Sequence, residues 1–298
     1  MIFTFILKLA IAKPHSLLYN TNMGIFSFLK RKKQKPIPPQ VLGLALSGGG
    51  AKGFAHVGVL RAIEESELNF DVVVGTSVGS LVGALYSAGV DSYEMEKIGK
   101  SLKTGDILDK KFFIAPSKSQ NIEKLVKNVI GDIEFKDLNK KFACCATNML
   151  NGQEVVLQDG KVATAVSASC SAPIFFDGVE TDGMRLFDGG LVNNLPADLA
   201  RQLGANIVVG VTLSNTGTEG TEKTNPFSIA KSTFNIISRS TSIKGLMNSD
   251  LLIAPVLTNK RSSKLEGIES AEEMIKVGYE FAKLQIPKIY ELLNTYKG

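Results

Sequence analysis

Two glycine-containing turns, each placed between an apolar strand and a helix, constrain the fold of this chain more than any other feature. Residues 41–47 form a short apolar run that leads into Gly48-Gly49-Gly50, and a helical pattern follows over Phe54–Glu67. Residues 70–75 form a second apolar run, which passes through Gly75-Thr76-Ser77-Val78-Gly79 into another helical segment. Alternating helices and apolar strands predict a mostly parallel sheet that is covered by helices on both faces.

The same alternation continues to the end of the chain. Asn151-Gly152 between two strand-like runs predicts a hairpin, and Pro287 is expected to bend or break the last helix. We expect a leader over residues 1–40, a core over 41–213, and helices and one strand over 214–298 that complete the same domain. Helices are expected over 78–88, 92–102, 122–130 and 162–170, from 196, near 227–247 and from 270; strands are expected at 142–150, 154–157, 206–213 and 251–257.

The positive charge of the chain is concentrated at its N-terminus. The net charge is +5, but residues 1–40 hold seven basic side chains and no acidic one, which leaves 27 basic against 29 acidic side chains elsewhere. A slightly acidic body argues against a nucleic-acid partner. In residues 24–35, apolar side chains stand beside a Lys/Arg cluster, which is typical either of a peripheral contact with an anionic membrane or of a solvated basic leader.

Two further patterns bear on location and on metal binding. Residues 72–90 carry no charge and have small residues at helical spacing, as a membrane span does, but the three valines at the start favour a buried strand followed by a buried helix. The three cysteines, Cys144, Cys145 and Cys170, have no metal-ligand spacing. We therefore expect no metal, and the odd cysteine count together with the lack of a convincing signal peptide favours the cytoplasm.

Ser77 is the candidate nucleophile. It occupies the centre of a G-x-S-x-G pattern between a strand and a helix, where a sharp turn would lift its hydroxyl above the sheet edge. The helix that follows would direct its positive end at this position. The alternative is an ordinary strand-to-helix turn with a buried serine.

The first glycine turn, Ser47–Gly53, allows two functions. It contains G-x-G-x-x-G, which is typical of dinucleotide-binding turns, but the acidic residue that such a fold needs at the end of the second strand is replaced by Thr76 and Ser77. The other function is to expose backbone N–H groups toward an oxyanion beside a nucleophile on the neighbouring strand.

A serine nucleophile needs a base, and the chain has only two histidines. His15 lies in the leader, and His56 lies inside a helix, where a packing role is favoured. Asp188, followed by Gly189 and Gly190, is the alternative base. An ordinary aspartate has a pKa of about 3.9, so burial would have to raise it. Asp188 can equally be a surface turn residue.

In this order, SGGGAKG, GTSVG and DGG resemble the patatin-like phospholipase family, and GLALSGGGAKGFAHVGVL and DGGLVNNLPAD are similar to its small bacterial members. The resemblance covers about Leu42 to Leu213. It implies a three-layer α/β/α hydrolase with a mostly parallel central sheet, a Ser-Asp dyad and no cofactor. Ser77 would be the nucleophile and Asp188 the general base. The oxyanion hole would be formed at Gly48, Gly49 and Gly50, with Gly48 setting the turn, and the motif-supporting residues would be Lys52, Gly53, Gly75, Gly79, Gly189 and Gly190.

The resemblance favours a lipid acyl hydrolase that acts on phospholipids or related esters. A soluble carboxylesterase or thioesterase and a non-catalytic membrane-surface protein are the alternatives, and a dinucleotide-binding oxidoreductase is a more distant one. Lys52 stands where family members often have Arg, which removes a bidentate phosphate donor. The run Ile174-Phe175-Phe176 is a candidate wall for an acyl channel, or part of the core.

Overall fold

The computed structural model describes residues 39–102, 104–109, 115–214, 225–257 and 268–296. All of these belong to one compact unit, Pro38–Gly298. The membrane contact expected for residues 24–35 lies outside the described residues.

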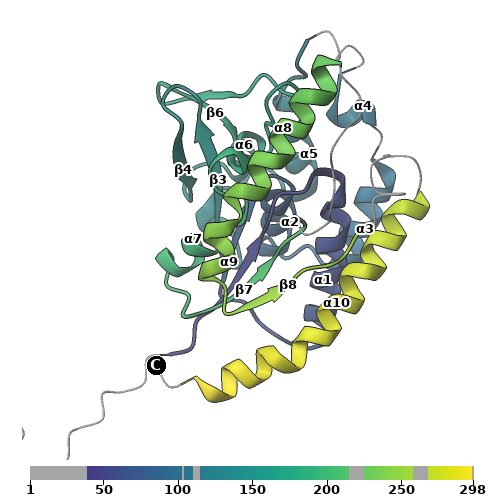
Figure 1. The fold of residues 1–298 in the computed structure, drawn as a ribbon, viewed down its shortest axis with the longest axis vertical. Coiled ribbons are helices and arrows are strands. Elements are labelled where there is room, and N and C mark those ends of the chain that lie inside the picture. The colour runs from purple at the N-terminus through teal and green to yellow at the C-terminus, as the bar shows by residue number, and fades with distance from the viewer. Residues whose placement is uncertain (1–38, 103, 110–114, 215–224, 258–267, 297–298) are drawn as a thin grey trace, which may run out of the picture. The chain divides into compact units, whose positions relative to one another are not determined.

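An eight-stranded sheet forms the middle layer (Figure 1). Its order is β5-β6-β3-β2-β1-β7-β8, and β4, which lies outside this order, pairs with β3. Strands β3, β2, β1, β7 and β8 run parallel, whereas β4, β5 and β6 join by antiparallel pairing. The strands are β1 (Leu42–Leu46), β2 (Val72–Thr76), β3 (Lys141–Asn148), β4 (Gln153–Leu157), β5 (Val179–Thr181), β6 (Met184–Asp188), β7 (Ile207–Val211) and β8 (Leu251–Ile253).

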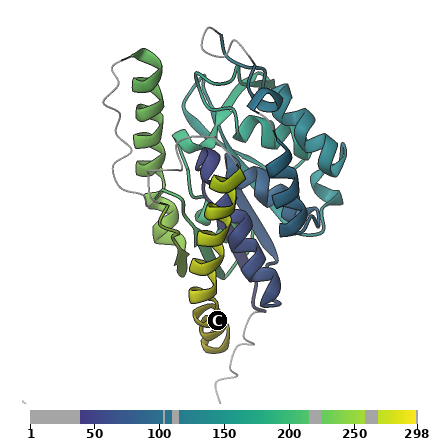
Figure 2. The same ribbon diagram turned by 90° about the vertical axis from the view of Figure 1, so that its right-hand side faces the viewer.

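Helices cover both faces of this sheet, so the predicted three-layer α/β/α class is confirmed (Figures 1 and 2). Successive residues of a strand point to opposite faces. Accordingly, Leu44 and Val73 pack in the core with α1 and α2, whereas Ala45 and Val74 pack with α7. The helices are α1 (Phe54–Glu65), α2 (Val78–Ser87), α3 (Ser92–Ser101), α4 (Thr104–Ile107), α5 (Gln120–Ile130), α6 (Val162–Ser169), α7 (Ala197–Gln202), α8 (Pro226–Thr241), α9 (Ile243–Asn248) and α10 (Ile268–Thr295), with 3-10 turns η1 (Gly50–Gly53), η2 (Phe135–Asp137) and η3 (Gly189–Leu191).

The register of the sheet places both glycine turns at one edge. Leu46, at the end of β1, lies opposite Gly75 of β2 and Val211 of β7. The turn after β1 and the turn after β2 therefore leave the sheet side by side. This is the edge at which parallel α/β sheets bind ligands.

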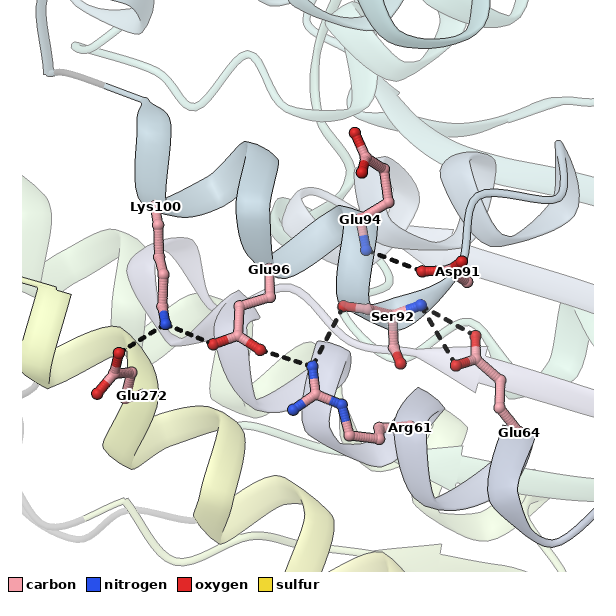
Figure 3. A network of polar contacts seen from close by, with 8 residues as sticks. All are labelled: Arg61, Glu64, Asp91, Ser92, Glu94, Glu96, Lys100 and Glu272. Carbon is pink, nitrogen blue, oxygen red and sulfur yellow. Dashed lines mark hydrogen bonds and ion pairs between the residues drawn. The ribbon is translucent and has the colours of Figure 1, made fainter.

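The long helix α10 lies alongside α1 in both views (Figures 1 and 2), and close backbone contact holds the two together. A Cβ atom on Gly58 would lie 1.9 Å from the carbonyl oxygen of Ile275. A chain of charges reinforces this contact, because Lys100 of α3 lies 2.6 Å from both Glu96 and Glu272, and Glu96 also lies 2.6 Å from Arg61 (Figure 3). Hydrogen bonds from Lys100 and Arg61 lower the pKa of Glu96.

Some expectations about the elements were wrong in detail. The segment expected as one helix near 227–247 is two helices, α8 and α9. The last helix begins at Ile268 rather than at Ser270, and it is not broken at Pro287, since it runs on to Thr295. Residues 72–90 contain β2 and α2, so the membrane-span alternative was wrong, and within the described ranges no helix is long and apolar enough to cross a membrane.

Candidate active site

Ser77 lies in the sharp turn between β2 and α2, as the G-x-S-x-G pattern predicts. Its φ of 54° and ψ of −131° are a strained backbone conformation for a residue with a side chain. The flanking glycines allow the chain to turn so tightly, since a Cβ on Gly75 would lie 2.3 Å from the carbonyl oxygen of Gly79 and one on Gly79 would lie 2.2 Å from that of Leu46. The side chain of Ser77 remains half-exposed.

Hydrogen bonds hold the Ser77 backbone on both sides. Its N–H donates to Ser169 Oγ (3.0 Å), which in turn donates to the carbonyl oxygen of Cys145 (2.7 Å). Its carbonyl oxygen accepts from the N–H and the hydroxyl of Ser80 at 2.8 and 2.7 Å. The strained conformation is thus fixed by the surrounding structure.

The turn after β1 lies directly beside Ser77. A Cβ on Gly48 would come within 3.2 Å of Ser77 Cβ. The Gly48 N–H donates to the carbonyl oxygen of Asn194 (3.0 Å), so this amide is already engaged. The N–H groups of Gly49 and Gly50 donate to no other group within the part of the chain that the structure describes. Gly50 adopts a φ of 57°, which a glycine accommodates without strain.

The last two residues of this turn, Lys52 and Gly53, are half-buried and buried. Gly53 lies against Val78, since a Cβ there would lie 2.1 Å from Val78 Cγ2. Lys52 is half-buried in η1. Of these two motif-supporting residues, Gly53 therefore lies where the first turn meets the start of α2.

Asp188 ends β6 and is completely buried, which excludes the surface-turn alternative. Its Oδ1 accepts from the Gly190 N–H (2.8 Å), whereas Oδ2 has no hydrogen bond of ordinary geometry among the described residues. Burial raises the pKa of Asp188 to about 7, and hydrogen bonding to Gly190 N–H and to the nearby Ser77 side chain limits the rise. Gly189 lets the turn pass close to β3, since a Cβ there would lie 2.3 Å from the carbonyl oxygen of Cys145.

Three residues that the sequence analysis did not single out connect these segments. Thr76 Oγ1 donates to the carbonyl oxygen of Asn193 (2.8 Å), which links the residue before Ser77 to the segment after Asp188. The Asn194 side chain donates to Ser214 and Ser242 (3.1 and 3.0 Å). Thr76 lies inside the G-x-S-x-G pattern, and Asn193 and Asn194 follow the DGG motif closely. This position beside the motifs is the only feature of the sequence that could have pointed to a role at the site.

His56 has a packing role, as expected. It is fully buried, and its Nε2 lies 2.8 Å from the carbonyl oxygen of Ser47, at the start of the first glycine turn. Burial lowers its pKa to about 4. His56 is therefore uncharged at neutral pH and positions the turn.

The apolar run after α6 divides between core and surface. Phe176 is buried in the main core and Phe175 packs against it, whereas Ile174 is 40% exposed and has a φ of 78°. Ile174 is thus the most exposed residue of the three.

Comparison with known proteins identifies the family. The profile of the patatin-like phospholipase family matches residues 44–201, which contain both glycine turns and Asp188. The chain therefore belongs to the patatin-like phospholipase family. This membership favours the hydrolase interpretation of the first turn over the dinucleotide-binding one.

Two curated relatives and one solved structure illustrate the similarity. Lysophospholipase nte1 of Aspergillus fumigatus is 32% identical over 179 residues, or 58% of this chain and 12% of that protein. Patatin-like phospholipase domain-containing protein 7 of Mus musculus is 34% identical over 180 residues, or 57% and 13%. The crystal structure of VipD from Legionella pneumophila matches with a TM-score of 0.59 and 16% identity over 85% of this chain and 68% of that one, which supports the fold. The matched segment is thus about an eighth of the length of these curated relatives.

Proposed function

We propose that this protein is a serine hydrolase that cleaves fatty-acyl esters of phospholipids or related lipids. The observation that carries the proposal is the pairing of Ser77, on a strained turn, with a buried carboxyl whose pKa is raised to about 7. Family membership and a relative named lysophospholipase support a lipid substrate.

Ser77 and Asp188 form the reacting pair in this proposal. The Asp188 carboxylate takes the proton of the Ser77 hydroxyl as Oγ attacks the ester carbonyl carbon. A base works best when its pKa lies near the working pH, and burial brings the pKa of Asp188 into that range. With Oδ1 held by the Gly190 N–H, Oδ2 is the oxygen that receives the proton.

The glycine turn stabilises the negative charge that develops on the ester oxygen. The N–H groups of Gly49 and Gly50 are the donors, because Gly48 already donates to Asn194. Ser77 also stands at the N-terminus of α2, whose positive end favours the same charge. Collapse of the tetrahedral intermediate breaks the bond to the alcohol, which leaves with the proton held by Asp188.

The second half of the reaction repeats these roles with water. Asp188 takes a proton from a water molecule as its oxygen attacks the Ser77 acyl ester, and the glycine amides again bind the oxyanion. Return of the proton to Ser77 releases the fatty acid and restores the site. The dyad thus needs no histidine.

The test is hydrolysis by the purified chain of a phospholipid, a lysophospholipid and a water-soluble p-nitrophenyl ester. Ser77→Ala and Asp188→Asn should each lower kcat on the preferred substrate by about 10³-fold or more. Ser101→Ala and Asp159→Asn, which change the same residue types on the exposed surface, are the matched controls. Full activity of Ser77→Ala would refute the proposal, and hydrolysis of the soluble ester alone would replace the lipid substrate with the esterase alternative.

A further inference from the structure

Helix α8 is attached to the rest of the molecule along one side only. None of its described side chains is buried. Ile229 and Ile236, two helical turns apart, are 50% and 64% exposed. Figure 2 shows this helix, in green, at the outer edge of the molecule. Large aliphatic side chains on an exposed helix face indicate a contact surface.

Helix α9 carries further exposed apolar side chains. Ile243, Leu246 and Met247 are 55%, 37% and 82% exposed, and they follow α8 after a single residue, Ser242. Figures 1 and 2 place both helices in the same outer layer. We refer to the exposed aliphatic side chains of the two helices, Ile229, Ile236, Ile243, Leu246 and Met247, as the α8–α9 face.

The charged side chains that helices α8 and α9 themselves carry are all positive. Residues 225–249 contain Lys231, Arg239 and Lys244 and no Asp or Glu. Lys231 and Arg239 are exposed, whereas Lys244 is paired with Asp198 (2.6 Å). The folded body as a whole is slightly acidic, so this basic and apolar segment differs from the remaining surface.

The inner side of α8 contacts the candidate active site. Thr241 Oγ1 donates to the carbonyl oxygen of Gly190 (2.8 Å), two residues after Asp188. A Cβ on Gly190 would lie 2.9 Å from Ser238 Oγ. Ser242, between the two helices, accepts a hydrogen bond from Asn194, whose carbonyl oxygen holds the Gly48 turn. Whatever binds the outer side of α8 is therefore one helix away from the site.

We propose that the α8–α9 face is the surface on which the protein docks to an anionic lipid–water interface, an inference that rests on the function proposed above. Exposed aliphatic side chains on helices that also carry lysine and arginine suit such an interface, since the former enter the acyl boundary and the latter attract anionic headgroups. A second copy of the chain fits less well. Pairing of identical faces would bring together the basic side chains of two copies of α8, a helix that carries no carboxylate to offset them.

The test measures binding of the full-length chain to sedimenting vesicles of phosphatidylcholine alone, or of equal parts phosphatidylcholine and phosphatidylglycerol. All proteins carry Ser77→Ala, so the lipid stays intact. A parallel set also carries Lys30→Gln, Arg31→Gln, Lys32→Gln and Lys33→Gln, so that binding by residues 1–40 does not mask the result. The apolar variant is Ile229→Ser/Ile236→Ser, and the matched control is Leu284→Ser on α10, where the side chain is 70% exposed.

The apolar variant should lower the vesicle partition coefficient by about tenfold or more, whereas Leu284→Ser should leave it unchanged. Lys231→Gln/Arg239→Gln should weaken binding to the anionic vesicles by about 25-fold, roughly fivefold for each charge, with little change on phosphatidylcholine. Equal binding by the apolar variant and Leu284→Ser in both sets would overturn the inference, as would self-association of the chain through this face without vesicle binding.

A second readout separates this inference from the proposed function. With Ser77 intact, the ratio of activity on vesicles to activity on the soluble ester should fall in the apolar variant. An unchanged ratio would overturn the docking role. Absence of all ester hydrolysis with intact, face-dependent vesicle binding would instead overturn the proposed function and leave the docking surface standing.

Discussion

Replacing Asp188 by Asn should make the protein more stable at neutral and alkaline pH, even though it removes activity. The pKa of Asp188 is raised from 3.8 to about 7 by burial. The protonated carboxyl therefore makes its full contribution to the free energy of unfolding below about pH 4, and this contribution is lost as the pH rises through about 7. A shift of about three units corresponds to about 4 kcal/mol at roughly 1.4 kcal/mol per unit. Asn cannot ionise, so the variant does not lose this free energy.

The assay is urea denaturation of the wild type and Asp188→Asn at several pH values between 4 and 8. The free energy of unfolding of the variant, minus that of the wild type, should increase by about 4 kcal/mol across this range. Asp159→Asn, which makes the same substitution at an exposed position, provides the matched control. A pH-independent difference for Asp188→Asn would refute the assignment of a raised pKa to a buried carboxyl.

Three further predictions concern the turns around the site. Burial lowers the pKa of His56 from 6.5 to about 4. In urea titrations, the free energy of unfolding of the wild type should therefore fall by about 3 kcal/mol, relative to that of His56→Gln, as the pH is lowered from 7 to 4. A difference that stays constant with pH would contradict this prediction. Gly79→Ala puts a Cβ 2.2 Å from the carbonyl oxygen of Leu46 and should lower the free energy of unfolding by more than about 3 kcal/mol or prevent folding. A Cβ on Gly105 meets nothing within 4 Å, so Gly105→Ala is the control and should show the circular dichroism spectrum of the folded wild type. Ser77→Gly should be more stable than Ser77→Ala by about 1 kcal/mol in thermal unfolding, because glycine relieves the positive φ; equal midpoints would count against strain at this turn.

The two strand–turn–helix units could be predicted from the sequence because their signals are local. An apolar run, glycines at fixed spacing and a helical pattern lie within a few residues of one another, and the structure places the ends of these elements within two residues of expectation. The position of Ser77 follows from the same local pattern. The need for a buried Asp188 followed from its chemistry, since an exposed aspartate is too weak a base.

The hydrogen bonds that hold the site together could not be predicted, because they join segments that are distant in sequence. A hydrogen bond such as that from Thr76 to Asn193, or from Ser77 N–H to Ser169, leaves no periodic pattern and depends on how the strands are ordered. The same limit applies to α8, whose amphipathic sequence indicates a helix but not which part of the molecule it contacts. Only the fold shows that its inner side reaches Gly190.

The most direct test of the central claim is to treat the purified chain with a fluorophosphonate and to identify the modified residue by mass spectrometry. Our account predicts a single phosphonyl adduct, on Ser77, that forms much more slowly in Asp188→Asn, because the activated hydroxyl is the one beside the buried carboxyl. Modification of a different serine, or equally fast modification of Ser77 in the Asp188→Asn variant, would contradict the Ser77–Asp188 pair.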